Sequence, residues 1–406
     1  MRRRIAVTGL GVVSPVGTGH QAFWEAILAG RTGTGPVRSF DASRYPSNRG
    51  GEIPDFRPGE HVRNLPPGTA ARASLLAAAA ARLALADAGL DPASLEPERA
   101  GVAMGTTSGE PREVEVFNDR HVADDLAGVG PEFMDLYPCH TIAAAVAAEV
   151  GFAGVNAMIP TACAAGNYAV AFAADALAAG RADLMLAGGA DSFSRITYTG
   201  FSRLGAISPD LCRPFDRNRR GMIPGEGAGV LVLEPLDRAL ARGATVYAEV
   251  AGYGLSCDAH HMTGAHPEGE GAARAMERAL RSAGLTPEDV SYVSAHGTGT
   301  PSNDRLEAVA VHRLFGARAR RVPISSIKSM LGHTMGAASA LEAIACSLAV
   351  ATGRVPPTAN YEEPDPDCDL DVVPNEAREL AVGVAMNNAY AFGGNNASVI
   401  FRECRA

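Results

Sequence analysis

The 406-residue sequence lacks the patterns of several common protein classes. Its seven cysteines show no CxxC spacing, which argues against a zinc site or a disulfide framework and predicts a reducing compartment with at most one reactive thiol. It has no GxxxxGK[ST] loop and no long uninterrupted apolar run, so we expect neither a P-loop nucleotide site nor a membrane span. The formal charge of −9 argues against nucleic-acid binding and means that an acidic partner must dock on a local basic patch.

The N-terminus imitates a short signal peptide but lacks its features. Arg2 to Arg4 precede an apolar run, yet Thr8, Gly9 and Gly11 interrupt that run and no small-residue cleavage site follows it cleanly. We therefore expect a first β-strand that enters a glycine turn, and a protein that stays in the cytoplasm.

Apolar, strand-like runs alternate with alanine-rich helical stretches, which is the pattern of α/β layering. The length fits two large α/β units in one body. The expected strands are Ile5–Val7, Ala100–Met104, Leu184–Gly188, Gly229–Glu234, Val246–Tyr253, Val290–Ser294 and Ala397–Phe401. The expected helices are Ala70–Ala88, Ala164–Ala179, Gly269–Ala283, Asp304–Leu314 and Ala337–Ala351.

Two pairs of similar segments indicate an internal repeat. RIAVTGLG at 4–11 and VYAEVAGYG at 246–254 are both strands that run into glycines. GEGAGVLVLE at 225–234 and GGNNASVIFRE at 393–403 both lead into an apolar strand that closes on an acidic residue. Such similarity predicts two related βαβ-rich halves, which we place at residues 1–240 and 241–406.

Cys163 lies in the segment PTACAAG, after an apolar run and before a helix of very small residues. A strand–turn–helix arrangement would put it at a helix N-terminus, where the helix dipole and free N–H groups stabilise a thiolate. Small neighbours would let a long substrate reach the sulfur. The alternative, taken from this motif alone, is a buried packing cysteine.

Two histidines occupy positions suited to catalysis. His296, in AHGTGTP, follows a predicted strand on a glycine-flanked loop, and Thr300 and Pro301 can begin the next helix. His333, in MLGHTMGA, stands at the start of the helix predicted at 337–351, and a helix N-terminus keeps an imidazole neutral. Each motif alone also fits a loop histidine or a capped helix without a catalytic role.

Other motifs carry weaker signals. Lys328 and Glu342 could form a charge pair, and the glycines after Phe392 fit either a plain turn or a turn whose N–H groups form an oxyanion hole. The segment Gly9–Ser14 resembles a dinucleotide loop but lacks its third glycine. A cluster of three histidines matches no common metal-ligand spacing; it comprises His260, His261 and His266.

The motifs occur in an order that is more specific than any one of them. They are TACAAG at 161–166, RPFDRNRRGMIPGEGA at 213–228, DAHHMT at 258–263, HGTGTP at 296–301, SSIKSMLGHTMGA at 325–337 and FGGNN at 392–396. With these motifs the whole chain resembles the elongating β-ketoacyl-acyl-carrier-protein synthases. The resemblance implies a thiolase fold, a five-layer αβαβα body built from two pseudo-repeated halves. It also implies a dimer, with residues 131–140 near the partner and the acyl tunnel.

The resemblance further implies a decarboxylative condensation without a bound metal or redox cofactor, on substrates carried by the phosphopantetheine of an acyl carrier protein. Cys163 is similar to the acylated nucleophile of the family, and its N–H would share an oxyanion hole with that of the gating residue Phe392. The pair His296 and His333 would serve decarboxylation. The remaining implied residues are Lys328 and Glu342 as a supporting charge pair, and Thr298, Thr300 and Thr263 as phosphopantetheine contacts.

Some positions depart from the pattern of housekeeping fatty-acid enzymes. Ser108 stands where a bulkier aliphatic residue often borders the acyl pocket. Tyr390-Ala391 stands before Phe392 where Phe-Gly is usual, and Ser302-Asn303 replaces the more frequent Leu-Gly or Ala-Gly before Asp304. Lysines expected near residues 65–70 for carrier docking are missing. The remaining docking candidates are Arg72, Arg203, Arg219 and Arg220. These departures favour a specialised polyketide or polyene synthase, which pairs with itself or with a chain-length-factor-like homologue that lacks the nucleophile.

The main alternative is a non-elongating member of the same superfamily, either an acyltransferase that uses only Cys163 or a structural partner subunit. Retention of His296 and His333 argues against it, because a transferase needs no decarboxylation pair. Initiating synthases have asparagine in place of the second histidine, and thiolases rely on a second catalytic cysteine, whereas Cys404 lies outside any such motif. A dinucleotide-dependent reductase is a more distant alternative.

Overall fold

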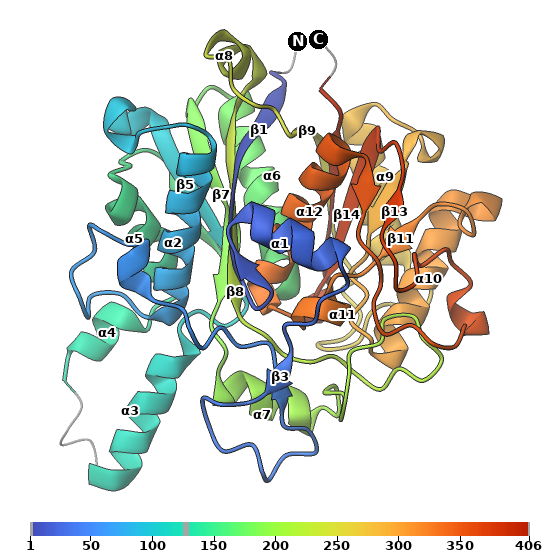
Figure 1. The fold of residues 1–406 in the computed structure, drawn as a ribbon, viewed down its shortest axis with the longest axis horizontal. Coiled ribbons are helices and arrows are strands. Elements are labelled where there is room, and N and C mark those ends of the chain that lie inside the picture. Colours follow the sequence, from blue (N-terminus) through green and yellow to red (C-terminus); the bar gives the residue numbers. More distant parts are fainter. Residues whose placement is uncertain (1–2, 125–129, 405–406) are drawn as a thin grey trace.

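The structure, a computed structural model, describes residues 3–124 and 130–404 (Figure 1). Its centre is one mixed β-sheet to which β2 (Gly17–Thr18) adds a short hairpin on β1. The other strands lie in the order β11 (Ile324–Ser325), β10 (Tyr292–Ser294), β14 (Val384–Tyr390), β15 (Asn395–Arg402), β9 (Ala248–Cys257), β1 (Ile5–Ser14), β8 (Gly227–Pro235), β7 (Leu184–Asp191), β5 (Ala100–Gly105) and β6 (Asn156–Ile159).

The strand order repeats itself on either side of the β1–β9 contact. β6-β5-β7-β8-β1 and β11-β10-β14-β15-β9 have the same order and the same parallel and antiparallel pairings. The two sets meet where Ala6 and Val7 pair with Glu249 and Ala248. The internal repeat predicted from the glycine-ended strands is therefore confirmed as two copies of one five-stranded unit.

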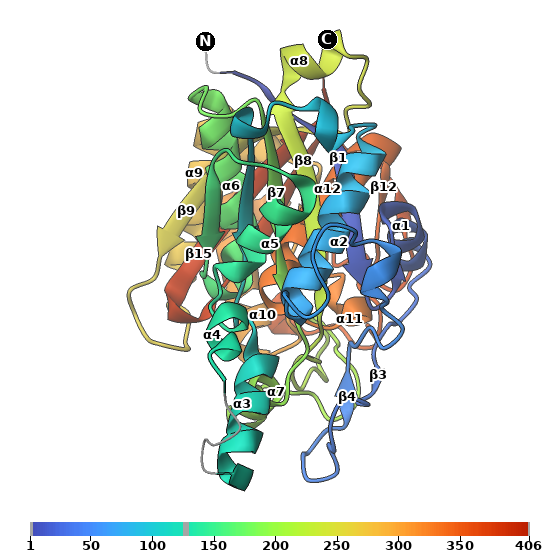
Figure 2. The same ribbon diagram turned by 90° about the vertical axis from the view of Figure 1, so that its left-hand side faces the viewer.

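The two halves of the sheet form two layers, and helices form three more, one outside each half and one between them. α2 (Arg72–Asp87) and α5 (Thr141–Val150) cover the N-terminal strands, while α9 (Glu270–Ala283) and α10 (Pro301–Phe315) cover the C-terminal ones (Figures 1 and 2). α6 (Ala165–Ala178) and α12 (Ala338–Thr352) contact each other and strands of both halves (Figure 1). This is the predicted five-layer arrangement, with two buried helices in the middle.

Glycine and alanine make the layers thin enough to pack closely. A Cβ on Gly11 of β1 would overlap the carbonyl of Ala80 in α2, and one on Gly254 of β9 would overlap that of Ala275 in α9. The dinucleotide interpretation of residues 9–14 is therefore wrong, because these glycines lie inside a buried strand against a helix. The alanine-rich helices bury most of their surface, as small side chains permit.

The stretch Met335–Thr352 is long and apolar enough to cross a membrane, with a mean hydropathy of 1.5, but 83% of it is buried inside the fold. It is the central helix α12 with the turn that precedes it. A core helix meets the same criteria of length and composition as a membrane span.

Sequence patterns located most of the long buried elements, but they missed the buried strand β14 and most of the short or exposed elements. The elements without a prediction are β2, β6, β11, β14, β3 (Gly35–Pro36), β4 (Arg49–Gly50), β12 (Arg354–Val355), β13 (Arg378–Glu379), α1 (His20–Leu28), α3 (Pro111–Asp124), α4 (Glu132–Leu136), α5, α7 (Arg195–Arg203), α8 (Leu236–Ala241) and α11 (Lys328–Leu331). Figures 1 and 2 show α3 and α4 projecting from the body. In this region the side chains of Met134 and Tyr137 are 64% and 42% exposed. Contact of residues 131–140 with a partner subunit stays a prediction.

Candidate active site

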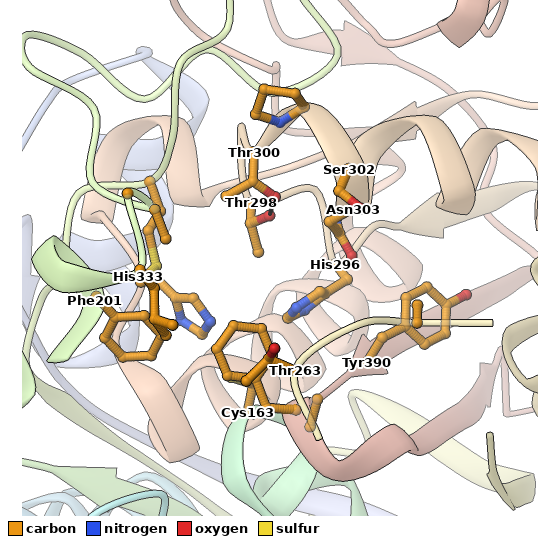
Figure 3. A pocket seen from close by; sticks show the side chains of 18 of the residues that line it. Cys163, Phe201, Thr263, His296, Thr298, Thr300, Ser302, Asn303, His333 and Tyr390 are labelled. Atoms are coloured by element: carbon orange, nitrogen blue, oxygen red, sulfur yellow. Dashed lines mark hydrogen bonds between the residues drawn. The ribbon is translucent and has the colours of Figure 1, made fainter. Parts of the chain in front are cut away.

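Three side chains predicted from separate motifs come together at the junction of the two halves. Sγ of Cys163 and ring nitrogens of His296 and His333 all lie within 4.8 Å of one another. They line a cavity of about 370 Å³, where both imidazole rings face the side of Cys163 (Figure 3). The cysteine comes from the N-terminal half, and the histidines come from loops of the C-terminal half.

Cys163 sits in a 3₁₀ turn, Ala162–Ala164, that continues directly into α6. Ala162 has a φ of 51°, a left-handed conformation that costs energy for a residue with a Cβ and sharpens the turn before the nucleophile. Burial raises the pKa of the Cys163 thiol to about 12, against the lowering effect of the Lys328 ammonium. Cys163 therefore lies at the start of a helix, as predicted. A helix start favours the thiolate, but burial of the side chain disfavours it.

His333 is held as a neutral imidazole with its Nε2 protonated. The N–H of Met335 donates to Nδ1 over 3.1 Å, so the ring hydrogen lies on Nε2. Burial, and then the Lys328 ammonium, hold the pKa of His333 well below its usual range. The turn is tight, because Gly332 and Met335 have φ angles of 75° and 54°.

His296 is fixed through its backbone. Its own N–H and that of Gly297 donate to the two carboxylate oxygens of Glu307 on α10, over 2.8 and 2.7 Å. The ring meets that of His333 edge to face, with centroids 5.6 Å apart. Burial, the Lys328 ammonium and His333 together hold the pKa of His296 well below its usual range. Both imidazoles are therefore neutral and able to donate a hydrogen bond.

Lys328 and Glu342 form the predicted ion pair beneath the histidines, between Nζ and Oε1. Their side chains are only 2% and 1% exposed. Burial raises the pKa of Glu342 to about 7, although the Lys328 ammonium opposes the rise. A buried ion pair of this kind is expensive in desolvation, so a role beyond stability is expected for it.

The composition of the sequence also indicates a special role for Lys328. It is the only lysine in the chain, and the other 35 of the 36 basic residues are arginines. An arginine is bulkier and prefers planar, bidentate partners, whereas a lysine places a compact charge in a narrow site. The one position that keeps lysine is also one of the most deeply buried.

The predicted substrate-binding residues divide into two groups. Thr298, Thr300, Thr263 and Phe392 line the cavity that holds Cys163 (Figure 3 labels the three threonines). The hydroxyls of Thr298 and Thr300 are 2.9 Å apart. The Phe392 ring is near the mouth, 41% exposed, with its centroid 5.8 Å from that of Phe201. Ser108 is not in the lining, and its N–H donates to Asp191.

Two of the four docking candidates are wrong. Arg72 is bound to Glu226, and Arg219 is buried and paired with Asp365, so neither is free to meet a partner protein. Arg203 is exposed beside Leu204 and Gly205 of the cavity mouth. The side chain of Arg220 is 60% exposed, 3.1 Å from Asp210.

The histidines of the 258–266 segment shape a loop. Nδ1 of His261 accepts the N–H groups of Thr263 and Gly264, and Nδ1 of His266 accepts that of Glu268. Within residues 3–124 and 130–404, the cluster with metal-ligand geometry is instead that of the cysteine and the two catalytic-site histidines. The Lys328 ammonium beside that cluster disfavours a second cation there.

Sequence reasoning missed two buried carboxylates that organise the site, Asp191 and Glu307. Glu307 lies one turn after Asp304 on the buried face of α10, and an acidic residue on such an apolar face was a usable signal. Asp191 ends the apolar strand β7 after two glycines and an alanine, where a charged residue is equally out of place.

A nucleophile and two neutral imidazoles, buried where two repeated α/β units meet, define a thiolase-fold enzyme that forms carbon–carbon bonds from thioesters. The chain belongs to the β-ketoacyl synthase family. The family model described as Beta-ketoacyl synthase, N-terminal domain, matches residues 2–239, and that described as Beta-ketoacyl synthase, C-terminal domain, matches residues 247–362.

Individual relatives come from two branches of metabolism. The chain is 44% identical to the tetracenomycin polyketide synthase ketoacyl synthase alpha subunit of Streptomyces glaucescens, over 98% of this chain and 97% of that protein. It is 38% identical to 3-oxoacyl-[acyl-carrier-protein] synthase 2 of Synechocystis, over 99% and 98%. A solved structure described as the ishigamide ketosynthase/chain length factor matches with a TM-score of 0.97 and 44% identity, over all of both chains.

Proposed function

We propose that the protein catalyses the decarboxylative condensation of an acyl group held on Cys163 with malonyl-acyl carrier protein, which yields β-ketoacyl-acyl carrier protein. The observation that carries the proposal is the convergence of the thiol with two neutral, buried imidazoles within 4.8 Å. A simple acyltransferase would need the nucleophile but not the paired donors.

In the first half-reaction, Sγ of Cys163 attacks the thioester carbonyl of an acyl-carrier protein. A new carbon–sulfur bond forms, the bond to the pantetheine sulfur breaks, and the pantetheine thiol leaves with the proton. The negative charge on the carbonyl oxygen is met by the N–H groups of Cys163 and Phe392, which act as an oxyanion hole.

In the second half-reaction, malonyl-carrier protein loses carbon dioxide and leaves a thioester enolate. Nε2–H of His333 and a ring N–H of His296 donate to the enolate oxygen, and neutral donors give up no proton to the carbon that must react. Each such donor contributes about 3–4 kcal/mol, or about a thousandfold in rate. The enolate carbon attacks the Cys163 thioester, the new carbon–carbon bond forms and the bond from the acyl carbon to Sγ breaks. The released thiolate takes up a proton from water and regenerates the thiol.

The other predicted residues support these steps. The Lys328 ammonium, held by Glu342, adds to burial in lowering the pKa of both histidines. Thr298, Thr300 and Thr263 hold the phosphopantetheine arm. Ser108 is proposed to border the acyl chain from the loop after β5. We assign the nucleophile to the half at 1–240 and the histidines to the half at 241–406, and the mechanism calls for no metal or redox cofactor.

The pathway we favour is specialised polyketide or polyene synthesis. The polyketide subunit from Streptomyces and the ketosynthase/chain length factor structure are each 44% identical to this chain, against 38% for the Synechocystis enzyme. We propose a dimer with a second copy or with a chain-length-factor-like homologue, a carrier protein that docks near Arg203 and Arg220, and a cytoplasmic location.

The test is the intact-protein mass of the wild type and of Cys163→Ala after mixing with acyl-carrier protein and then malonyl-carrier protein. We expect an acyl adduct only on the wild type, discharged by malonyl-carrier protein as a β-ketoacyl product. An adduct that never elongates would favour the transferase, and an adduct on Cys163→Ala would refute the nucleophile. Saturated C16–C18 products from the homodimer would refute the specialised pathway.

A further inference from the structure

Asp191 is a fully buried carboxylate to which the proposed mechanism gives no role. It is the last residue of β7, and because β5 and β7 are parallel, it faces the loop that follows β5. Oδ1 accepts the Thr106 hydroxyl and the Ser108 N–H, both over 2.9 Å. Oδ2 accepts the N–H groups of Thr107 and Gly336, both over 2.7 Å.

Gly336 belongs to the turn that carries His333, and its neighbour Met335 donates to Nδ1 of that histidine. The turn rests directly on the loop and the carboxylate. A Cβ on Gly336 would lie 2.6 Å from Oδ2 of Asp191 and 2.6 Å from the backbone of Thr106. The backbone of His333 is held by Ile223 and Gly225, whereas the bond from Gly336 to Asp191 fixes the part of the turn where the Met335 N–H meets the His333 ring.

We infer that Asp191 is a positioning residue for His333, because it holds the 333–337 turn against the 106–108 loop and so sets where Nε2 of His333 points. The inference rests on the proposed function, in which that Nε2–H donates to the enolate. Four donors converge on two oxygens, an arrangement that an ionised carboxylate satisfies fully because it only accepts. Burial raises the pKa of Asp191 to about 6, so the carboxylate is still mostly ionised at neutral pH.

The perturbing variant is Asp191→Asn. If its NH₂ group replaces Oδ2, it faces the N–H groups of Thr107 and Gly336 and both bonds are lost; if it replaces Oδ1, the Ser108 N–H loses its acceptor while the Thr106 hydroxyl can turn to accept. In either orientation the remaining N–H groups donate to a neutral amide oxygen instead of a carboxylate, which weakens their hold on the turn. We expect the release of carbon dioxide from malonyl-carrier protein to fall roughly tenfold to a hundredfold, as small displacements of a catalytic group do. Acylation of Cys163 by acyl-carrier protein should not fall, because it does not use His333 and because removal of the Asp191 charge removes one contribution that raises the pKa of the thiol.

Glu149 provides a matched control. It is also fully buried, on α5, and accepts the N–H groups of Arg63, Asn64 and Leu65 and the side chain of Arg82. Glu149→Gln should lower the melting temperature as Asp191→Asn does, while both half-reactions proceed at the wild-type rate. If Asp191 had only a structural role, both variants would lower the melting temperature, and Asp191→Asn would not change the rate of decarboxylation relative to that of acylation.

The possible results test the role of Asp191 separately from the proposed function. Unequal loss of the two half-reactions in Asp191→Asn, absent in Glu149→Gln, supports the inference. Equal loss of both rates, or unchanged release of carbon dioxide, overturns it. If Asp191→Asn does not fold, Asp191→Ser replaces it with a smaller acceptor and is judged by the same two rates. A wild-type protein that is acylated but releases no carbon dioxide refutes the proposed function itself.

Discussion

Lys328→Met removes the only ammonium group of the active site and leaves Glu342 buried without its partner. Loss of one member of a buried pair typically costs about 3–5 kcal/mol, because the remaining charge is no longer compensated. The cost should shrink as the pH falls, and it should do so already above pH 7, because burial raises the pKa of Glu342 to about 7 even with Lys328 present and loss of the opposing ammonium raises it further. A protonated carboxyl needs no cation. The double variant Lys328→Met, Glu342→Gln should regain most of the lost stability.

Activity should respond differently from stability. The Lys328 ammonium lowers the pKa of both His296 and His333, so its removal should raise both pKa values. An imidazole that protonates at higher pH moves the acidic limit of malonyl decarboxylation to higher pH. That shift should persist in the double variant, because restoring charge balance does not restore the ammonium.

The measurements are thermal unfolding and the pH profile of carbon dioxide release, each on wild type, single and double variant. The double variant is the control for stability. If it regained both stability and the wild-type pH profile, the pair would be purely structural and the electrostatic argument for Lys328 would be refuted.

Three further predictions concern other groups. His333→Ala should slow malonyl decarboxylation about a thousandfold, measured as released carbon dioxide, while Cys163 is still acylated; equal loss of both would contradict the role. Tyr390→Phe should raise the free energy of unfolding by roughly 1 kcal/mol, measured by thermal unfolding, because within the described residues the buried Tyr390 hydroxyl has no hydrogen-bond partner. A lower stability of the variant would mean that the hydroxyl does have a partner. Burial raises the pKa of Glu110 from 4.5 to about 7, so the folded state keeps that proton longer than the unfolded chain and stability falls as pH rises through this window. Glu110→Gln should reduce the dependence of the unfolding free energy on pH, measured by denaturation at several pH values. An unchanged dependence would mean that another group causes it.

The sequence was most informative where a residue's environment is set locally. Helices such as α12 are long, apolar and bounded by glycine, so they are visible without a structure. Only Ile5–Val7 of β1 was predicted, because the glycines inside this strand imitate a turn. The positions of Cys163, His296 and His333 followed from short motifs at strand ends and helix starts. In contrast, α3 and α7 are short or exposed, and no apolar pattern marks them.

What could not be predicted depends on contacts between distant segments. The opposing effects on Cys163 are one example, since a helix start favours its thiolate while burial among both halves raises its pKa to about 12. The failure of Arg72 and Arg219 as docking residues is another, because their partners Glu226 and Asp365 lie 154 and 146 positions away. Asp191 and Gly336 are 145 positions apart, and no local pattern connects them.

The raised pKa of the Cys163 thiol and the lowered pKa values of the two histidines share their largest cause, which is burial of all three groups away from bulk water. A site that keeps all three groups neutral suits decarboxylation, because a neutral donor stabilises an enolate without protonating its carbon. It suits the first step less well, since a thiol attacks a thioester slowly. The Lys328 charge lowers the pKa values of the thiol and of both histidines, and so favours the form that each step requires. One buried ammonium can thus serve both half-reactions, which is a physical reason for the single lysine of the chain to stand at this position.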